Sequence, residues 1–272
     1  MKYLLPVLFV VLFLPFSAWA KDREATLYYE VYASGFHVMD VQIHIKTTKK
    51  KYDVRLDTEL TGLLARFVPW QGAFETRGSI ERGELIPKYH ITSATWKKET
   101  ELREYFYNAS GHLNKMTLKE NGIAQDIATS SELSSDTTDI LTLFLSIILK
   151  GECGFEEDIF DGKRRFATEF RGEGDAYLYK SKINPYQGEA ELCDVEITPK
   201  GGKWYKKPRG WLAIQEQGRE KGKLPVIYLA RVDEMFPALP VKGITVSNYG
   251  TFLLHLKHVV YDNQPIETCR EC

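Results

Sequence analysis

The stretch that decides the fold runs from Ser134 to Cys153 and reads SSDTTDILTLFLSIILKGEC. Apolar residues fill nearly every position from Ile140 to Leu149, and the polar exceptions recur at every fourth position, in one narrow stripe of an α-helix. The stripe consists of Thr138, Thr142, Ser146 and Lys150. About a dozen residues are too few to span a bilayer. The pattern therefore predicts a buried helix, at about residues 136–150, enclosed by the rest of the chain.

Both ends of this helix carry residues typical of helix ends. Ser134, Ser135 and Asp136 are candidates for the N-cap, and Gly151 stands where a helix adopts its left-handed stop. Asp136 and Asp139 bracket the first turn, where carboxylates complement the helix dipole. We interpret them as capping residues and not as an acid–base pair.

The rest of the chain reads as strands and turns. Apolar and polar residues alternate from Ala25 to Tyr52, as in an antiparallel sheet with one wet face. Asp161-Gly162, between two such runs, is the strongest hairpin signal. We predict a mainly β fold, in which a curved antiparallel sheet or an incompletely closed β-barrel wraps around the helix. Two lobes divided near residues 120–135 are the alternative.

The first 20 residues have the features of a secretory signal. An apolar run from Leu4 to Phe16 precedes Ala18-Trp19-Ala20, a small-x-small cleavage pattern. Cleavage after Ala20 leaves one β-rich domain (21–262) and a C-terminal tail (263–272). We expect a periplasmic protein with no transmembrane segment in the mature chain, and an uncleaved anchor is the alternative.

Composition and motifs exclude several functional classes. The 36 basic and 37 acidic residues nearly balance, which provides no electrostatic reason for nucleic-acid binding. The sequence contains no GxSxG, HExxH, GxxxxGK[ST] or GxGxxG motif. We therefore predict no catalytic residues, no metal and no cofactor, and keep a hydrolase as the third alternative.

Four cysteines in an exported chain favour disulfides. We predict a Cys153–Cys193 bond that ties the end of the helix to a strand and stabilises the fold by roughly 4 kcal/mol through loop entropy. Cys269 and Cys272 form a Cys-Arg-Glu-Cys tail, for which a local disulfide or free thiols are predicted. A metal site and a redox pair are the alternatives.

Two histidine arrangements are candidates for chemistry. His37 precedes Asp40 by three residues, and His255 precedes His258 by three. Residues three apart in a regular strand point to opposite faces of the sheet. We therefore expect both pairs to diverge and predict no site from either.

Large apolar residues near the helix form the predicted ligand site. Trp70 and Phe74 flank Gln71-Gly72 and are expected at the mouth of whatever the sheet encloses. With Phe67 before them, and with Phe144 and Ile148 of the helix, they are the predicted ligand-binding residues. Plain core packing is the alternative.

Several stretches in their order and spacing resemble a known exported family. They are TGLLARFVPWQGAFETRG (61–78), the helix with its following GEC, FDGKRRF (160–166), the strand around Cys193, and PVIYLAR (225–231). The family is domain of unknown function thirty-one-oh-eight, in its alphaproteobacterial branch. The resemblance implies a periplasmic antiparallel β protein and carries over no catalytic residue. The outline is similar to periplasmic lipoprotein carriers and to spiral-sheet envelope-integrity proteins.

We hypothesise a non-enzymatic envelope protein that binds a lipid or another apolar ligand, such as an acylated protein, in a sheet-lined cavity. The alternative is a protein–protein interaction or envelope-integrity module without a small ligand, whose strand edges bind an envelope protein partner.

Overall fold

The computed structural model describes residues 22–97, 99–120, 122–204, 211–234, 236–248 and 250–268. The expected signal sequence and the C-terminal pair Cys269 and Cys272 lie outside these described residues.

The described residues form one 15-stranded antiparallel sheet. Its strands are β1 (Arg23–Ala33), β2 (Phe36–Thr47), β3 (Lys51–Leu60), β4 (Trp70–Glu81), β5 (Glu84–Trp96), β6 (Glu99–Tyr107), β7 (Leu113–Glu120), β8 (Ile123–Ile127), β9 (Phe155–Phe160), β10 (Arg164–Leu178), β11 (Gly188–Gly202), β12 (Val226–Ala230), β13 (Leu239–Ser247), β14 (Gly250–Tyr261) and β15 (Gln264–Ile266). The short helices are α1 (Gly62–Phe67), α2 (Ser131–Ser134), α3 (Ile140–Lys150) and α4 (Trp211–Glu220).

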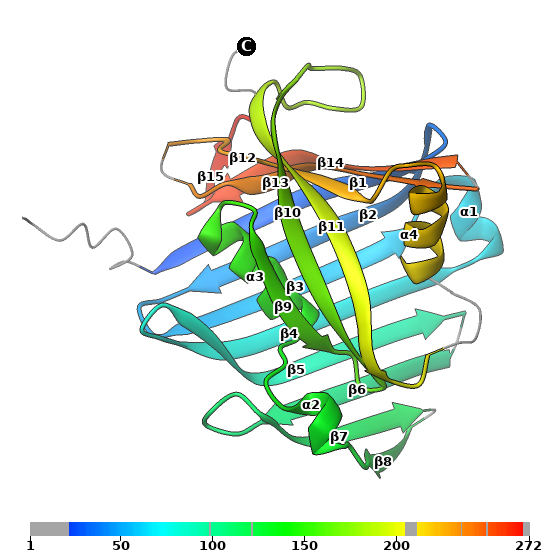
Figure 1. Cartoon of the computed structure of the whole chain (residues 1–272), viewed down its shortest axis with the longest axis vertical. Helices are drawn as coiled ribbons and strands as arrows, with labels where there is room; N and C mark the ends of the chain where they lie inside the picture. The colour runs from blue at the N-terminus through cyan, green and yellow to red at the C-terminus, as the bar shows by residue number, and fades with distance from the viewer. Residues whose placement is uncertain are drawn as a thin grey trace, which may run out of the picture.

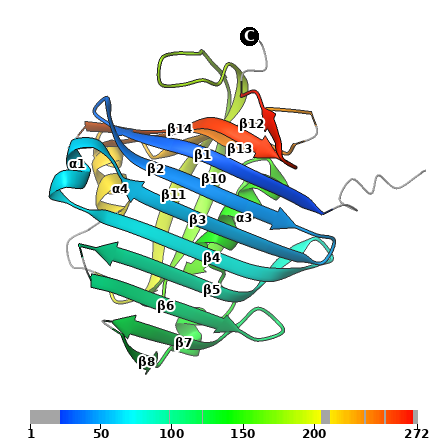
Figure 2. The same ribbon diagram turned by 180° about the vertical axis from the view of Figure 1, so that it is seen from behind.

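The sheet curls around α3 without closing. Its order is β8-β7-β6-β5-β4-β3-β2-β1-β14-β13-β12-β11-β10-β9, and β15 adds to β14. Strands β1 to β8 form a broad curved layer (Figure 2), and β9 to β11 cross in front of it with α3 between (Figure 1). The end strands β8 and β9 do not pair with each other. The predicted curved antiparallel sheet around one helix is thus confirmed.

Helix α3 begins later than expected. Asp136 has a left-handed backbone (φ 53°), and Asp139 is the extended N-cap, whose carboxylate accepts hydrogen bonds from the amides of Leu141 and Thr142. Of the two predicted capping carboxylates, only Asp139 therefore caps the helix. Gly151 is the left-handed C-cap (φ 67°), as predicted.

Side chains from opposite sides of α3 enter two core clusters. Leu141, Leu145 and Ile148 join the larger cluster, with residues of β1 to β4. Leu143 and Ile147 join the smaller cluster, with residues of β9 to β12. The helix therefore fills the space between the two layers of the curled sheet.

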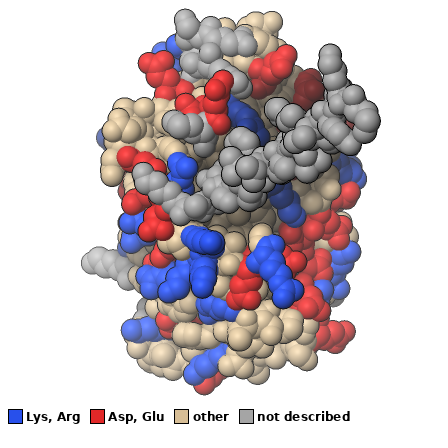
Figure 3. Space-filling view, turned by 90° about the vertical axis from the view of Figure 1, so that its left-hand side faces the viewer, with Lys and Arg blue, Asp and Glu red and all other residues tan. Residues whose placement is uncertain are grey.

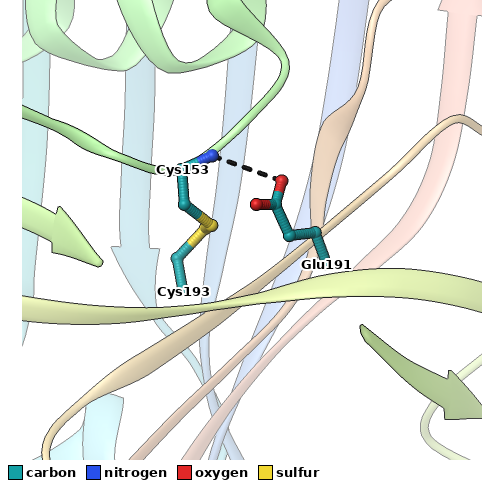
Figure 4. The surroundings of a disulfide bond; sticks show 3 residues. All are labelled: Cys153, Glu191 and Cys193. Atoms are coloured by element: carbon teal, nitrogen blue, oxygen red, sulfur yellow. Dashed lines mark hydrogen bonds between the residues drawn. A yellow bond between two sulfur atoms is a disulfide. The ribbon is translucent and has the colours of Figure 1, made fainter. Parts of the chain in front are cut away.

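The predicted Cys153–Cys193 disulfide is present and joins the end of α3 to β11 (Figure 4). Their Cα atoms are 5.7 Å apart and the residues are 40 positions apart in sequence. The Glu191 carboxylate accepts a 3.2 Å hydrogen bond from the Cys153 amide. The bond therefore holds α3 at its C-terminal end, as Asp139 does at the other.

Two elements lie where the sequence pattern predicts neither. Helix α4 is fixed to β11 by the buried amide of Gln215, which donates to the Ile197 carbonyl and accepts from the Ile197 amide. Strand β15 continues the sheet past residue 262, where the tail was expected to begin. None of the helices in the described ranges has the length and apolar content required to cross a bilayer.

Candidate functional site

A strip of half-buried apolar side chains lies on the inner face of the sheet, the face that carries α3. Trp70 and Phe74 lean together over Gly72, where an added Cβ would lie 2.9 Å from the Trp70 ring and 3.0 Å from the Phe74 ring. Leu56 faces Phe74 across the β3–β4 ladder. We call Leu56, Trp70, Phe74 and Phe144 of α3 the inner strip. Leu56, Phe74 and Phe144 pack against the larger core cluster.

The five predicted ligand residues do not all converge. Trp70, Phe74 and Phe144 belong to the inner strip, whereas Ile148 is 2% exposed and lies inside the core. Phe67 is 73% exposed on α1, away from the core. Three of the five are therefore half-buried, and their role in ligand binding stays a prediction.

A charged residue that sequence reasoning missed lies near this strip. Phe74, Thr92 and Arg103 are successive cross-strand neighbours, so Arg103 lies on the inner face. Two strand spacings separate the backbones of Phe74 and Arg103 by about 10 Å. Its guanidinium pairs with Glu101, while its buried Nε has no hydrogen-bond partner among the described residues. Counting by twos from the buried Tyr105 in β6 could have placed Arg103 on this face.

Beside the strip, a buried polar node joins α3 to the sheet. The Asp139 carboxylate accepts hydrogen bonds from the Thr76 hydroxyl (2.6 Å) and the Thr142 hydroxyl (2.7 Å). Since both threonine hydroxyls donate their protons to Asp139, they can only accept further hydrogen bonds. Tyr52 OH therefore donates to Thr142 (2.8 Å), and His90 Nδ1 donates to Thr76 (2.6 Å). We call these five residues the polar node.

The polar node positions the helix. Burial lowers the pKa of His90, and the nearby Asp139 only partly opposes this effect. Asp139, His90 and Thr76 are all buried, so a substrate cannot reach them in this arrangement. Thr142 also lines a hollow of about 520 Å³ between α3 and the β4–β5 turn, together with the rest of the predicted polar stripe, Thr138, Ser146 and Lys150.

On the outer face, two β-bulges overturn the expectation that the histidine pairs diverge. One register shift lies at Val31/Tyr32 against β2, and the other lies at Tyr28/Tyr29 against β14. Each extra residue resets the alternation of sides. His37 Nε2 therefore lies 2.8 Å from Asp40 Oδ1. His255 and His258 pair with Glu30 and Tyr28, two residues that share one face of β1.

The result is an outer cluster of polar and aromatic side chains. It consists of Tyr28, Glu30, Tyr32, His37, Asp40, His255, Lys257 and His258. Tyr28 and His258 stack with ring centroids 4.0 Å apart. The Glu30 carboxylate accepts a 2.5 Å hydrogen bond from Tyr32 OH and lies 3.1 Å from Lys257 Nζ. A hollow of about 690 Å³ adjoins this cluster and is lined also by Gln42, Asp57, Glu59, Gln71, Ser93 and Thr95.

Burial and charge perturb the protonation of the outer cluster. Burial, aided by Lys242 and Lys257, lowers the pKa of His255 to about 4. Burial and the hydrogen bond to Glu30 raise the pKa of Tyr32 to about 12. Burial opposes ionisation of Glu30, but its bonds to Tyr32 and Lys257 prevail and lower its pKa. At neutral pH, Glu30 is therefore ionised and His255 is neutral.

Among the described residues, two groups of side chains have the composition of a metal site. Glu30, His37 and Asp40 each offer a ligand atom, and these atoms lie within 4.8 Å of one another. Each of these side chains already has a partner, because Glu30 pairs with Lys257 and His37 hydrogen-bonds to Asp40. Cys153, Cys193 and Glu191 also lie within this distance, but both sulfur atoms belong to the disulfide.

Comparisons with known proteins place the chain in a family. The model of the family described as "Protein of unknown function (DUF3108)" matches residues 28–257. The chain belongs to the DUF3108 family. This DUF3108 protein matches no curated protein.

Among solved structures, the DUF3108 chain is similar to the "Crystal Structure of Beta-barrel-like Protein of Domain of Unknown Function DUF1849 from Brucella abortus". The TM-score is 0.44 at 9% sequence identity, and the match covers 88% of this chain and 97% of that chain.

Proposed function

We propose that this protein is a non-enzymatic, periplasmic envelope protein of the alphaproteobacterial branch of its family. It binds the acyl chain of a lipid or an acylated protein against the inner strip. The observation that carries the proposal is the pair Trp70 and Phe74, which stay half-buried on the inner face although α3 fills the neighbouring core. Apolar surface with a few placed polar groups is typical of small-ligand sites.

Arg103 extends the proposal to the ligand's head group. An acyl chain against Phe74 would place a carboxylate or phosphate within reach of the side chain of Arg103, which lies two strands away, at a backbone distance of about 10 Å. Arginine is well suited to such anions because it donates several hydrogen bonds from a rigid plane. The ligand is therefore an amphipathic molecule with an anionic head group, held in a half-open strip.

The first test is native mass spectrometry of the protein purified from its own periplasm, followed by organic extraction. A bound mass that extracts as a lipid supports the proposal. The second test titrates the purified protein with a fluorescent fatty acid. We expect Phe74→Ser to weaken binding about tenfold, because it removes apolar contact area, and Arg103→Gln to weaken binding of the acid but not of its methyl ester.

Phe106→Ser is the matched control, because Phe106 is half-buried on the opposite face, next to the buried Tyr105 of β6. Loss of binding in the control as large as in Phe74→Ser would show a stability effect and contradict the site. An apo mass together with no fatty-acid binding would overturn the proposal.

One observation favours the interaction module as a second candidate. The edge of β9 is covered, because the Thr138 amide donates to the Asp158 carbonyl and the Thr138 carbonyl accepts from the Phe160 amide. Strand β8 ends the sheet on the other side and pairs only with β7 among the described strands. An open edge can add a strand from a partner. Capture of an envelope protein that Gln125→Pro abolishes would support this candidate.

A further inference from the structure

One side of the sheet carries exposed apolar side chains at four successive turns. The β1–β2, β3–β4, β5–β6 and β7–β8 connections all lie on this side, which runs along the left of Figure 2. We call the following residues the apolar edge: Phe36 (75% exposed), Leu63 (68%), Leu64 (40%), Phe67 (73%), Trp96 (48%) and Ile123 (75%). At each of the four connections, at least one of them lies in the connection or at the end of an adjoining strand.

The opposite side of the sheet differs. Its turns are Thr48–Lys50, Arg82-Gly83 and Asn108–His112, and none of these described residues is a large exposed hydrophobic. Figure 3 shows that side, where basic and acidic side chains are interspersed. Six of the nine large hydrophobic side chains that are exposed among the described residues therefore lie at the apolar edge, and the other three are Ile140, Tyr177 and Tyr179.

Helix α1 is the most exposed part of the apolar edge. It buries none of its residues, and it is held to the sheet through its first turn, where the Thr61 amide donates to the Val38 carbonyl (2.9 Å). Leu63, Leu64 and Phe67 therefore project from a fixed base. Burying three such side chains would release several kcal/mol, so the surface is suited to an apolar environment.

The shape of the apolar edge favours a flat partner. Strands lie about 4.8 Å apart, so successive hairpin turns are separated by about 10 Å, and the row from β1 to β8 extends roughly 30 Å. A row of separate projecting side chains can enter a bilayer interface one by one, as Trp, Phe and Leu side chains do in interfacial proteins.

The charges along this edge favour a zwitterionic surface. Arg66 and Lys97 are exposed there, and so are Glu59 and Glu99. Mixed signs match a headgroup that carries both phosphate and ammonium, and they supply no net attraction to an anionic surface. We infer that the apolar edge docks the protein on a zwitterionic phospholipid bilayer. The inner strip reaches the same side of the sheet, since Trp70 pairs with Trp96 across the β4–β5 ladder.

The test is flotation of the purified full-length chain, after export, with phosphatidylcholine vesicles and with vesicles that also contain one-fifth phosphatidylglycerol. We expect co-flotation with both, with little dependence on salt. Leu63→Asp combined with Phe67→Asp should lower the vesicle-bound fraction about tenfold, because a charge replaces each inserted side chain. Phe36→Asp alone should lower it less.

Tyr179→Asp is the matched control, because Tyr179 is 74% exposed on the β10–β11 connection, away from the apolar edge. It should float as the native chain does. Circular dichroism should show that all variants are folded, since the substituted side chains are exposed.

Absence of flotation of the native chain, or equal loss in the Tyr179 control, would overturn the inference. A native dimer that Phe67→Asp dissociates, without vesicle binding, would overturn it in favour of a second copy. Because fatty-acid binding is measured without vesicles, failure of docking and failure of the proposed function are distinguishable.

Discussion

Helices α3 and α1 are built from similar residues and meet opposite environments. Helix α3 reads ILTLFLSIILK and buries six of its residues, whereas α1 reads GLLARF and buries none. The difference lies in their attachment. Helix α3 has Asp139 and the polar node at its start and the disulfide at its end. Helix α1 has a backbone bond at its base and no side-chain cap.

This contrast teaches that an apolar helix needs specified anchors to become a core element. The polar stripe that marks α3 in the sequence supplies Thr142, whose hydroxyl bonds to Asp139 and accepts from Tyr52. Helix α1 has no corresponding stripe, and its apolar side chains stay outside. We expect three sets of substitutions to test the comparison.

The largest effect should follow from removing the anchor of α3. Asp139→Ala leaves Thr76 and Thr142 hydroxyls buried without their acceptor and removes the cap, which should lower the free energy of unfolding by about 4 kcal/mol. Asp136→Ala is the control, because its side chain is 83% exposed, and it should cost less than about 1 kcal/mol. Urea unfolding followed by circular dichroism measures both. Equal losses would show that the polar node does not anchor the helix.

A smaller loss of stability should follow from removing packing contacts, and it should differ between the two helices. Leu145→Ala in α3 should lower the free energy of unfolding by about 3 kcal/mol, because it opens a cavity in the larger core cluster. Leu63→Ala in α1 should change it by less than about 0.5 kcal/mol. The same urea titrations measure this pair. A loss at Leu63 close to that at Leu145 would mean that α1 is covered in solution.

The smallest effect concerns pH. Burial lowers the pKa of His90 in the folded chain below its ordinary value of about 6.5. At pH values between these two pKa values, His90 binds a proton in the unfolded chain but not in the native chain. The contribution of His90 to the free energy of unfolding is therefore complete above pH 6.5. It falls as the pH drops, by at most about 1.4 kcal/mol per pH unit. His90→Gln should reduce that slope. An unchanged slope in His90→Gln would contradict the role of this histidine.

Much of the fold could be predicted from sequence because it depends on local patterns. The alternation of strands, the Asp161-Gly162 hairpin and Gly151 as the helix stop all express local backbone preferences. The start of α3 was predicted too early, since the left-handed backbone of Asp136 permits a turn before the true cap. Helix α4 was missed because its anchor, Gln215, is a polar residue that reads as surface.

The candidate sites were harder to predict because they depend on which face of the sheet each side chain occupies. The prediction that His37 diverges from Asp40, and His255 from His258, was wrong because one extra residue in each strand reverses the alternation. Arg103 was missed although its position relative to Tyr105 was available in the sequence. Ile148 and Phe67 were grouped together by composition, but they lie at opposite extremes of exposure.

The sequence by itself determined an antiparallel sheet around one helix, the Cys153–Cys193 bond and the left-handed stop of that helix at Gly151. Residue alternation, helix stops and cysteine chemistry act over short distances or through covalent bonds. Only the tertiary structure decided which face each histidine occupies, which apolar side chains enter the core, and which gather at the apolar edge. The physical reason is that burial depends on the neighbours supplied by strands far away in sequence. Two residues of the same type can therefore end in the core and in solvent.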